Sequence, residues 1–377
     1  MNGRQRVLTS LSHQEPDRVP LDIGGSIVTG IDKNVYNAWK SYLGLNGSTQ
    51  IVDHIQGLAF MEGAMKGKLH IDVDGFFPNS HRKHPPLTLQ NGVLTFRDEW
   101  GIVWRKPSSS LYFDVAQSPL QHAQSVHDIE SHHWPKPSKA ALNDWETEAE
   151  HRDSRRLTII ESFGSGIFEM ATRLRGYEQF LTDLFLNPTL AEAILDHILQ
   201  VKMEYIDLLA QHHIPCDVLR EGDDLATQQS LLFSQQMYRA YLFPRHRDLF
   251  AYVRKKLFPN PKIFFHSCGA IAPLLPDLIE AGIDIINPVQ FSASGMNVEQ
   301  LKKEFGDVLT FWGGGVDTQA TLPYGQPDQV KEEVKRQIDI LAPNGGFVFA
   351  AVHNIQNDVP LQNVLAMWEA WEENSRY

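Results

Sequence analysis

The sequence predicts an α/β protein built as a (β/α)8 barrel, or TIM barrel, with a β-hairpin insertion near the N-terminus. From residue 157 onward, short and almost continuously apolar runs alternate with amphipathic stretches long enough for helices. Such runs are typical of parallel strands that are buried on both faces. Two earlier candidates bring the strands to eight, and no glycine-rich dinucleotide fingerprint follows an early strand. We therefore expect residues 1–377 to form a single barrel.

The first elements of the barrel are predicted before residue 78. A short amphipathic helix opens the chain and is stopped by Pro16. A strand is expected at residues 19–23, where it runs into Gly24-Gly25, and a helix follows near residues 34–42. The second strand is expected at residues 71–77.

The hairpin insertion is predicted at residues 72–116. Two alternating runs, LTLQ and VLTF, flank Asn91-Gly92, which is the strongest short-range signal for a tight hairpin. Residues 122–156 contain several prolines and many charges without a sustained apolar period, so we expect a helical linker with loops there.

The other six strands share an apolar body that ends in small or polar residues. They are predicted at residues 157–162, 217–222, 262–267, 283–288, 308–314 and 346–353. Amphipathic helices are expected at residues 188–213 and 271–283.

Composition excludes several classes of partner. The chain has 34 Lys and Arg against 46 Asp and Glu, a formal charge of −12 that repels nucleic acid and anionic lipid surfaces. The two cysteines, Cys216 and Cys268, cannot form a disulfide framework, which favours a reducing compartment. Because no signal peptide and no run of 18 uncharged apolar residues occurs, we expect a cytoplasmic protein.

Polar residues follow the predicted strands where a barrel places its active site. We expect Glu221, Asp223 and Asp224 to be catalytic and His266, Cys268 and His353 to bind a metal. Substrate-binding roles are predicted for Asp22, Glu161, Asn287, Gln290, Asp317 and Asn354.

The metal prediction starts from the run KIFFHSCGA. Residues two apart on a strand face the same side, so His266 and Cys268 can present an imidazole and a thiolate together. These groups suit Zn²⁺, which in catalytic sites has three protein ligands and one open position. His353, at the end of the last predicted strand, is the candidate third ligand. Alternatively, His266 is a hydrogen-bonded core histidine and Cys268 a small buried apolar residue.

The acidic run REGDD has two interpretations. Close carboxylates raise the pKa of at least one of them, as proton transfer requires, and Glu221 or Asp223 can also support the metal. Alternatively, an aspartate here caps the N-terminus of a helix. The Gly/Ser-rich turn before Arg173 and Arg175 can bind an anion, but its spacing matches no phosphate-binding loop, which favours a structural role.

Several motifs along nearly the whole chain resemble the uroporphyrinogen decarboxylase superfamily, which has a (β/α)8 fold. The motifs are PDRVP, DEWGIVW, LRGYE, HSCG, DIINPVQ, FWGGGVDTQ and GGFVFAAVHNIQNDVPLQN. The corrinoid-dependent methyltransferase branch is the more similar one, because RVPLDIGGSIVTGIDK lacks the arginine-rich segment of the porphyrinogen decarboxylases.

The resemblance implies a zinc enzyme whose ligands are His-x-Cys followed by a distant cysteine. His266 and Cys268 match the first two, and His353 takes the place of the third. One thiolate and two imidazoles leave Zn²⁺ a net charge near +1, which favours polarising an ether oxygen. We therefore expect methyl transfer from a methoxylated small molecule to a corrinoid (cobalamin). The sequence has no D-x-H-x-x-G motif, so the corrinoid is expected on a partner protein.

Two other functions remain open from the sequence. One is a metal-independent decarboxylase or lyase that acts on a small carboxylic acid and uses Arg173 or Arg175 as an anion clamp. The other is a non-catalytic scaffold that binds a corrinoid or tetrapyrrole protein. A homodimer is also compatible with the sequence.

Overall fold

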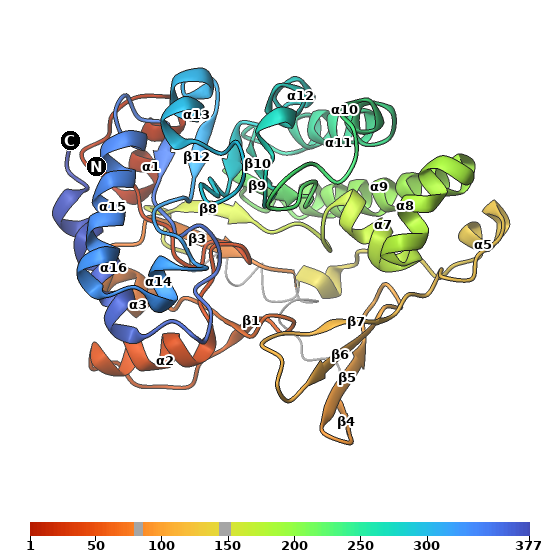
Figure 1. The fold of residues 1–377 in the computed structure, drawn as a ribbon, viewed down its shortest axis with the longest axis horizontal. Helices are drawn as coiled ribbons and strands as arrows, with labels where there is room; N and C mark the ends of the chain where they lie inside the picture. Colours follow the sequence, from red (N-terminus) through yellow and green to blue (C-terminus); the bar gives the residue numbers. More distant parts are fainter. Residues whose placement is uncertain (79–85, 143–151) are drawn as a thin grey trace.

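A curved parallel sheet lies at the centre of the computed structural model, which describes residues 1–78, 86–142 and 152–377 (Figure 1). Among these residues, seven strands pair in chain order, with β3 at one edge and β13 at the other. The strands are β3 (Val73–Phe76), β8 (Leu157–Ile160), β9 (Val218–Gly222), β10 (Lys262–His266), β11 (Ile285–Asn287), β12 (Thr310–Trp312) and β13 (Phe347–Val348). The predicted barrel class is confirmed.

The eighth strand position is reduced to one residue. Leu21 forms a parallel bridge with Phe349, just after β13. On its other side, the carbonyl of Leu21 accepts the Asp72 N–H at 3.0 Å. The strand predicted at residues 19–23 is therefore a single bridge that connects the two edges of the sheet. Pro20 explains part of the difference, because it has no N–H to extend the ladder.

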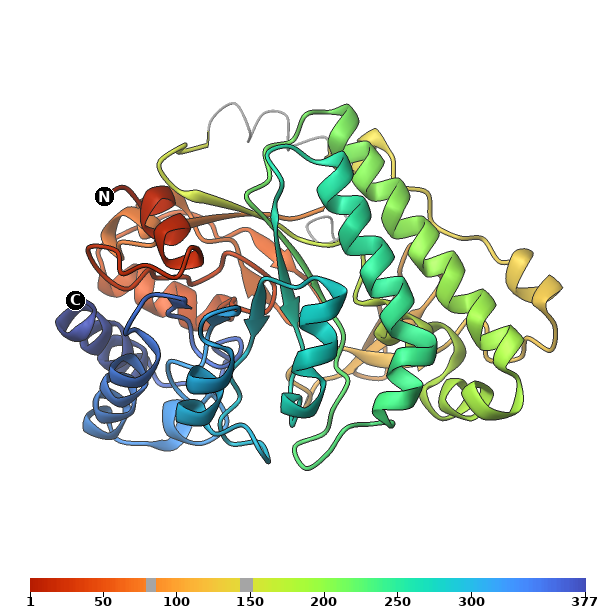
Figure 2. The ribbon, with the colours of Figure 1, turned by 90° about the horizontal axis from the view of Figure 1, so that it is seen from above.

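Helices surround the sheet and match the amphipathic stretches of the sequence (Figure 1). Helix α9 packs against α11, and the two lie side by side on one flank (Figure 2). The α-helices are α1 (Gly3–Leu11), α2 (Lys33–Tyr42), α3 (Gly63–Lys68), α5 (Val126–Glu130), α7 (Ile167–Arg175), α8 (Tyr177–Leu186), α9 (Pro188–Gln211), α10 (Gln235–Met237), α11 (Phe243–Lys256), α12 (Leu275–Ala281), α13 (Val298–Phe305), α14 (Thr321–Tyr324), α15 (Pro327–Leu341) and α16 (Leu361–Asn374). Short helices of other types are η1 (Lys139–Leu142), η2 (Tyr238–Leu242) and η3 (Ala272–Leu274).

A second, antiparallel sheet forms the insertion and lies apart from the barrel sheet (Figure 1). Its strands are β4 (Thr88–Gln90), β5 (Val93–Arg97), β6 (Val103–Pro107) and β7 (Asp114–Gln117). The predicted hairpin joins β4 to β5, and both turn residues, Asn91 and Gly92, have positive φ angles of 51° and 76°. Such angles are those of a type I′ turn.

The insertion differs from the prediction at its start. β3 lies within the range 72–116, yet it pairs with β8 as a strand of the barrel. Part of this range, residues 79–85, lies outside the described residues. A small two-stranded sheet of β1 (Ile51–Asp53) and β2 (Leu58–Ala59) precedes the insertion in the sequence.

The predicted helical linker at residues 122–156 contains the short helices α5 and η1 in its described part. Residues 143–151 of this linker lie outside the described residues. None of the helices described combines the length and the apolar character that crossing a membrane takes.

Candidate metal centre

A cavity of about 790 Å³ lies at the C-terminal ends of the barrel strands. Residues that follow β10 and β13 form one part of its wall, and the insertion sheet contributes an aromatic part with Phe96, Trp104 and Phe113. This volume falls in the range of small-molecule sites. The insertion therefore covers the end of the barrel where catalytic groups are expected.

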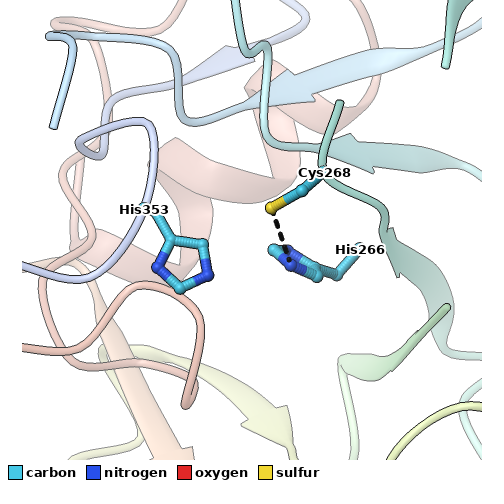
Figure 3. A group of neighbouring side chains, drawn as sticks. All are labelled: His266, Cys268 and His353. Atoms are coloured by element: carbon cyan, nitrogen blue, oxygen red, sulfur yellow. Dashed lines mark hydrogen bonds between the residues drawn. The ribbon is translucent and has the colours of Figure 1, made fainter. Parts of the chain in front are cut away.

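His266, Cys268 and His353 gather on the wall of this cavity (Figure 3). One possible ligand atom from each side chain lies within 4.8 Å of the other two. The Cys268 Sγ is 3.5 Å from the His266 Nε2, and the two imidazole rings are 5.5 Å apart between centroids. The three residues that the sequence predicted as metal ligands are thus brought together.

Asn287 fixes the orientation of His266. Its amide nitrogen donates to the carbonyl of Trp312 at 2.7 Å, so its oxygen Oδ1 is the atom that faces the imidazole. This oxygen lies 2.6 Å from the His266 Nδ1 and can only accept, so Nδ1 carries the hydrogen. The lone pair of Nε2 therefore points toward Cys268, as a metal ligand requires.

Burial favours the neutral form of both imidazoles. Desolvation lowers the pKa of His266 well below its usual value, and the nearby Arg220 lowers it further. Desolvation also lowers the pKa of His353. Burial raises the pKa of the Cys268 thiol well above its usual value, with a contribution from the neighbouring Asp224. A cation is the group that stabilises this buried thiol as a thiolate.

The donor atoms of the three side chains are those that a tetrahedral zinc ion takes, and their spacing is close to what it needs. Zn–N and Zn–S bonds of about 2.0 and 2.3 Å place tetrahedral ligand atoms roughly 3.3–3.5 Å apart. The Cys268–His266 distance of 3.5 Å already has this value. The set offers three ligands, and its exposure to the cavity leaves the fourth position to solvent or substrate.

The glycine opposite His266 makes room for this ligand. Gly222 of β9 pairs with His266 of β10 in the sheet. A Cβ at this position would lie 2.4 Å from the His266 carbonyl oxygen and 2.6 Å from its Cβ. No larger residue fits here without displacing the ligand.

A family model described as uroporphyrinogen decarboxylase matches residues 146–374, which is more than half of the chain. The chain belongs to the uroporphyrinogen decarboxylase family. The resemblance at the level of the family is thereby confirmed.

Three solved structures show different degrees of similarity to this chain, and the first of them shares its fold. A methyltransferase from Methanosarcina mazei superposes with a TM-score of 0.68 and 18% identity, and the match covers 99% of each chain. A putative vitamin-B12 independent methionine synthase from Listeria monocytogenes has a TM-score of 0.36 and 12% identity, over 63% of this chain and 68% of that one. Xylanase B from Clostridium stercorarium has a TM-score of 0.37 and 12% identity, over 62% of this chain and 83% of that one. A comparison with curated sequences gave no match.

Two of the three carboxylates predicted to be catalytic face away from the cavity in this family member. Glu221 points outward and pairs with Lys202 of α9, with 2.8 Å between the two side chains. Asp223 accepts the Glu169 N–H in the first turn of α7 at 2.9 Å and lies 2.9 Å from the His246 Nε2. The structure therefore supports the capping interpretation for Asp223. Successive residues of a strand alternate between faces, which explains both outward positions.

Asp224 is the carboxylate of this run that lines the cavity. Its Oδ1 accepts the N–H of Cys268 at 2.8 Å and lies 3.8 Å from the His266 Nε2. Asp224 therefore positions the backbone that carries the thiol, directly beside the ligand cluster.

The six predicted substrate-binding residues divide into two groups. Gln290 and Asn354 line the cavity, but both also hold loops: Gln290 accepts the Gly269 N–H at 2.6 Å and Asn354 accepts the Gly30 N–H at 2.6 Å. Four predicted residues lie outside the cavity wall: Asp22, Glu161, Asn287 and Asp317.

Each of those four has a structural partner. Asp22 accepts the Trp312 indole N–H at 2.9 Å, and burial raises the pKa of its carboxyl to about 6. Asp317 accepts the backbone N–H groups of Gln319 and Ala320, and Asn287 orients His266. Glu161 pairs with Arg220 at 3.0 Å. We therefore assign these residues supporting positions around the site.

Arg220 and Glu169 are among the ionisable cavity residues for which the sequence predicted no role. Burial raises the pKa of Glu169 to about 7, against the opposing effect of Arg173, whose Nη2 is 3.0 Å from its Oε1. Alternation along VLREG was the signal for Arg220, because it places Arg220 inward if Glu221 faces out. No comparable signal exists for Glu169, which reaches the cavity from a helix.

Proposed function

We propose that this protein is a zinc-dependent methyltransferase that moves a methyl group from a methoxylated small molecule to a corrinoid carried by a partner protein. The observation that carries the proposal is the cluster of His266, Cys268 and His353 on the wall of a cavity large enough for a small molecule. Membership of the family and the shared fold of a methyltransferase support it.

The three side chains would hold the zinc ion, which supplies a Lewis acid next to the oxygen that loses its methyl group. Asn287 keeps the His266 Nε2 free of hydrogen, so that this nitrogen could bind the ion. Asp224 fixes the backbone of Cys268 through its N–H. Two neutral imidazoles and one thiolate leave the centre a net charge near +1.

Glu169 is the residue that we assign to proton transfer, in place of Glu221 and Asp223. It lines the cavity, and its raised pKa of about 7 means that its carboxyl carries a proton in a substantial fraction of molecules at neutral pH. A carboxyl in this state can donate its proton to the departing oxygen. Arg173 holds the other side of the carboxyl through Oε1.

The decarboxylase or lyase alternative has less support from the geometry. Its proposed anion clamp was Arg173 or Arg175. Arg175 is buried and donates to Asp183 at 2.6 Å and to two backbone carbonyls, and Arg173 donates to Glu169 and Ser165. Both guanidinium groups already have partners.

Elemental analysis together with a methyl-transfer assay tests the proposed function. We expect one zinc per chain, and we expect methylation of cob(I)alamin, followed by its absorbance, with some member of a panel of methoxylated compounds. A protein purified without zinc that does not take up zinc would contradict the proposal. So would full methyl transfer by the variant His266→Ala.

A further inference from the structure

Trp104 connects the insertion sheet to the barrel at the wall of the cavity. It belongs to β6, is 4% exposed and lines the cavity together with Glu169 and Arg173 of α7. The Arg173 guanidinium lies over its ring, with 5.5 Å between the arginine Cζ and the ring centroid. The same guanidinium donates from Nη2 to Oε1 of Glu169 at 3.0 Å. One arginine therefore contacts both an aromatic ring of the insertion and the carboxyl that we assign to proton transfer.

The indole of Trp104 is fixed within the insertion from two sides. Its Nε1 donates to Oδ2 of Asp98 at 2.7 Å, and its ring stacks on that of Phe96 with 6.3 Å between the centroids. The other carboxyl oxygen of Asp98 accepts the backbone N–H groups of Trp100 and Ile102. The guanidinium thus lies against a ring that is held in one orientation.

The ring strengthens an ion pair that is weak by itself. Glu169 and Arg173 are four residues apart on α7, and such a pair on a helix surface favours the paired geometry only about twofold. The Arg173 Nη1 donates to the hydroxyl of Ser165, which is a neutral acceptor. An arginine over an aromatic ring contributes about a further two- to fivefold, and more where water is excluded. The contact with Trp104 therefore makes the pair persistent.

This arrangement determines which oxygen of Glu169 can carry a proton. Oε1 accepts the Arg173 N–H and therefore remains an acceptor. Oε2 has no hydrogen-bond partner among the described residues and is not sealed off by other atoms, so it is the oxygen that is open to the cavity. The proton of the neutral carboxyl consequently lies on Oε2, where a substrate oxygen can receive it.

We propose that Trp104 is a positioning residue of the reaction, because it keeps Arg173 on Oε1 of Glu169 and so keeps the proton on Oε2. This inference rests on the proposed function, in which Glu169 protonates the departing oxygen. As the bond between that oxygen and the methyl carbon breaks, its electron pair stays on the oxygen, which takes the proton from Oε2. The methyl group passes to the cobalt(I) of the acceptor, whose electron pair forms the new bond. Glu169 is left as a carboxylate paired with Arg173.

Double-mutant cycles measured by urea denaturation at pH 8 test the arrangement without an activity assay. Trp104→Leu and Glu169→Gln should be coupled, so that their combined effect on the unfolding equilibrium differs about two- to fivefold from the product of the single effects. In an Arg173→Met background the coupling should disappear, because Arg173 links the two side chains. Trp371→Leu is the matched control: Arg18 lies over this ring at 4.7 Å, outside the cavity, so no coupling to Glu169 is expected. Absent coupling, or coupling that survives Arg173→Met, overturns the inference.

Methyl-transfer kinetics test the role of Trp104 in the reaction. With cob(I)alamin and a methoxylated substrate, Trp104→Leu should lower kcat about tenfold and leave KM almost unchanged. Trp104→Phe keeps an aromatic face for the guanidinium and should restore most of kcat, and Trp371→Leu should keep all of it. Adding Trp104→Leu to Arg173→Met should cause no further loss. A further loss, or a raised KM with unchanged kcat, would show that Trp104 acts on the substrate directly and would overturn the inference.

The two sets of measurements separate this inference from the proposed function. A protein without methyl transfer that still shows the coupling would refute the proposed function and retain Trp104 as the residue that places Arg173 on Glu169. A protein that transfers methyl groups but shows no coupling would retain the function and refute the role of Trp104.

Discussion

The adjacent ends of β9 and β10 send their reactive side chains in different directions. The strands pair in parallel, and both His266, the last residue of β10, and Cys268, two residues beyond it, face the cavity. On β9 the inward positions are taken by Arg220 and Gly222 and, beyond the strand, by Asp224, whereas Glu221 and Asp223 face outward. A run of three carboxylates thus contributes one to the cavity, while a run with one histidine and one cysteine contributes both. Because successive side chains of a strand point to opposite faces, the position of a residue along β9 or β10 determines whether its side chain faces the cavity.

Removing a ligand from β10 should have the largest effect. His266→Ala takes away one of three zinc ligands, so zinc affinity should fall by about 4 kcal/mol, or roughly 1000-fold. Competition with a chromogenic chelator measures this change. His246→Gln, a change at the buried histidine paired with Asp223 outside the cavity, is the control and should keep its zinc. If His266→Ala and the parent protein bind zinc with equal affinity, His266 is not a zinc ligand.

A change on the outward face of β9 should affect stability and spare the metal. Asp223→Ala leaves His246 without its carboxylate and removes the acceptor at the start of α7, which should cost about 3 kcal/mol of unfolding free energy. Urea denaturation measures the loss, and elemental analysis should still find one zinc per chain. A loss of zinc with unchanged stability would show that Asp223 belongs to the site after all.

Removing the support of His266 should have a smaller effect on zinc. Asn287→Ala frees the imidazole to rotate and change tautomer, so zinc affinity should fall about 10- to 100-fold. Asn363→Ala is a matched control, because Asn363 is a buried asparagine that donates to Leu322 and Gly325 away from the cavity. The two variants should lose similar stability, but only Asn287→Ala should bind zinc more weakly.

The smallest expected effect is the pH dependence of the unfolding free energy that is due to Glu169. Its pKa of about 7 in the folded protein lies above the ordinary 4.5, so the folded state keeps the proton more firmly. The resulting stability is complete below pH 4.5 and is lost as the pH rises through 7. Glu169→Gln should therefore gain about 1–2 kcal/mol over the parent protein between pH 5 and 8. Urea denaturation at both pH values measures it, with Glu178→Gln, an exposed glutamate of α8, as the control. A constant difference between parent and Glu169→Gln contradicts the raised pKa.

Much of the barrel was predictable because its strands are nearly continuous apolar runs. The strand at residues 19–23 was the exception, since a run with Pro20 and two following glycines supports only one bridge. The last strand also ends earlier than predicted, at Val348, so His353 reaches the site from the segment that follows β13.

The site was predictable where two residues share a face of one strand, as His266 and Cys268 do. It was not predictable where the face itself was uncertain, as for Arg220 against Glu221. Nor does the sequence show which buried carboxylate has a hydrogen-bond or ion-pair partner in the fold. Asp22, Asp317 and Glu161 lie near the ends of predicted strands, as the predicted metal ligands do, but each has such a partner. The residue type shows that a side chain can react. Only the fold shows whether that side chain already has a hydrogen-bond or ion-pair partner.

The position of His353 sets when the three ligands can meet. His266 ends β10 and Cys268 follows it, whereas His353 follows β13, after the intervening strands and helices have been added to the barrel. During synthesis on the ribosome, residue 353 must emerge before the third ligand can join the other two. An ion bound by all three side chains would therefore be acquired by an almost finished barrel, and it could not assist the earlier steps of assembly.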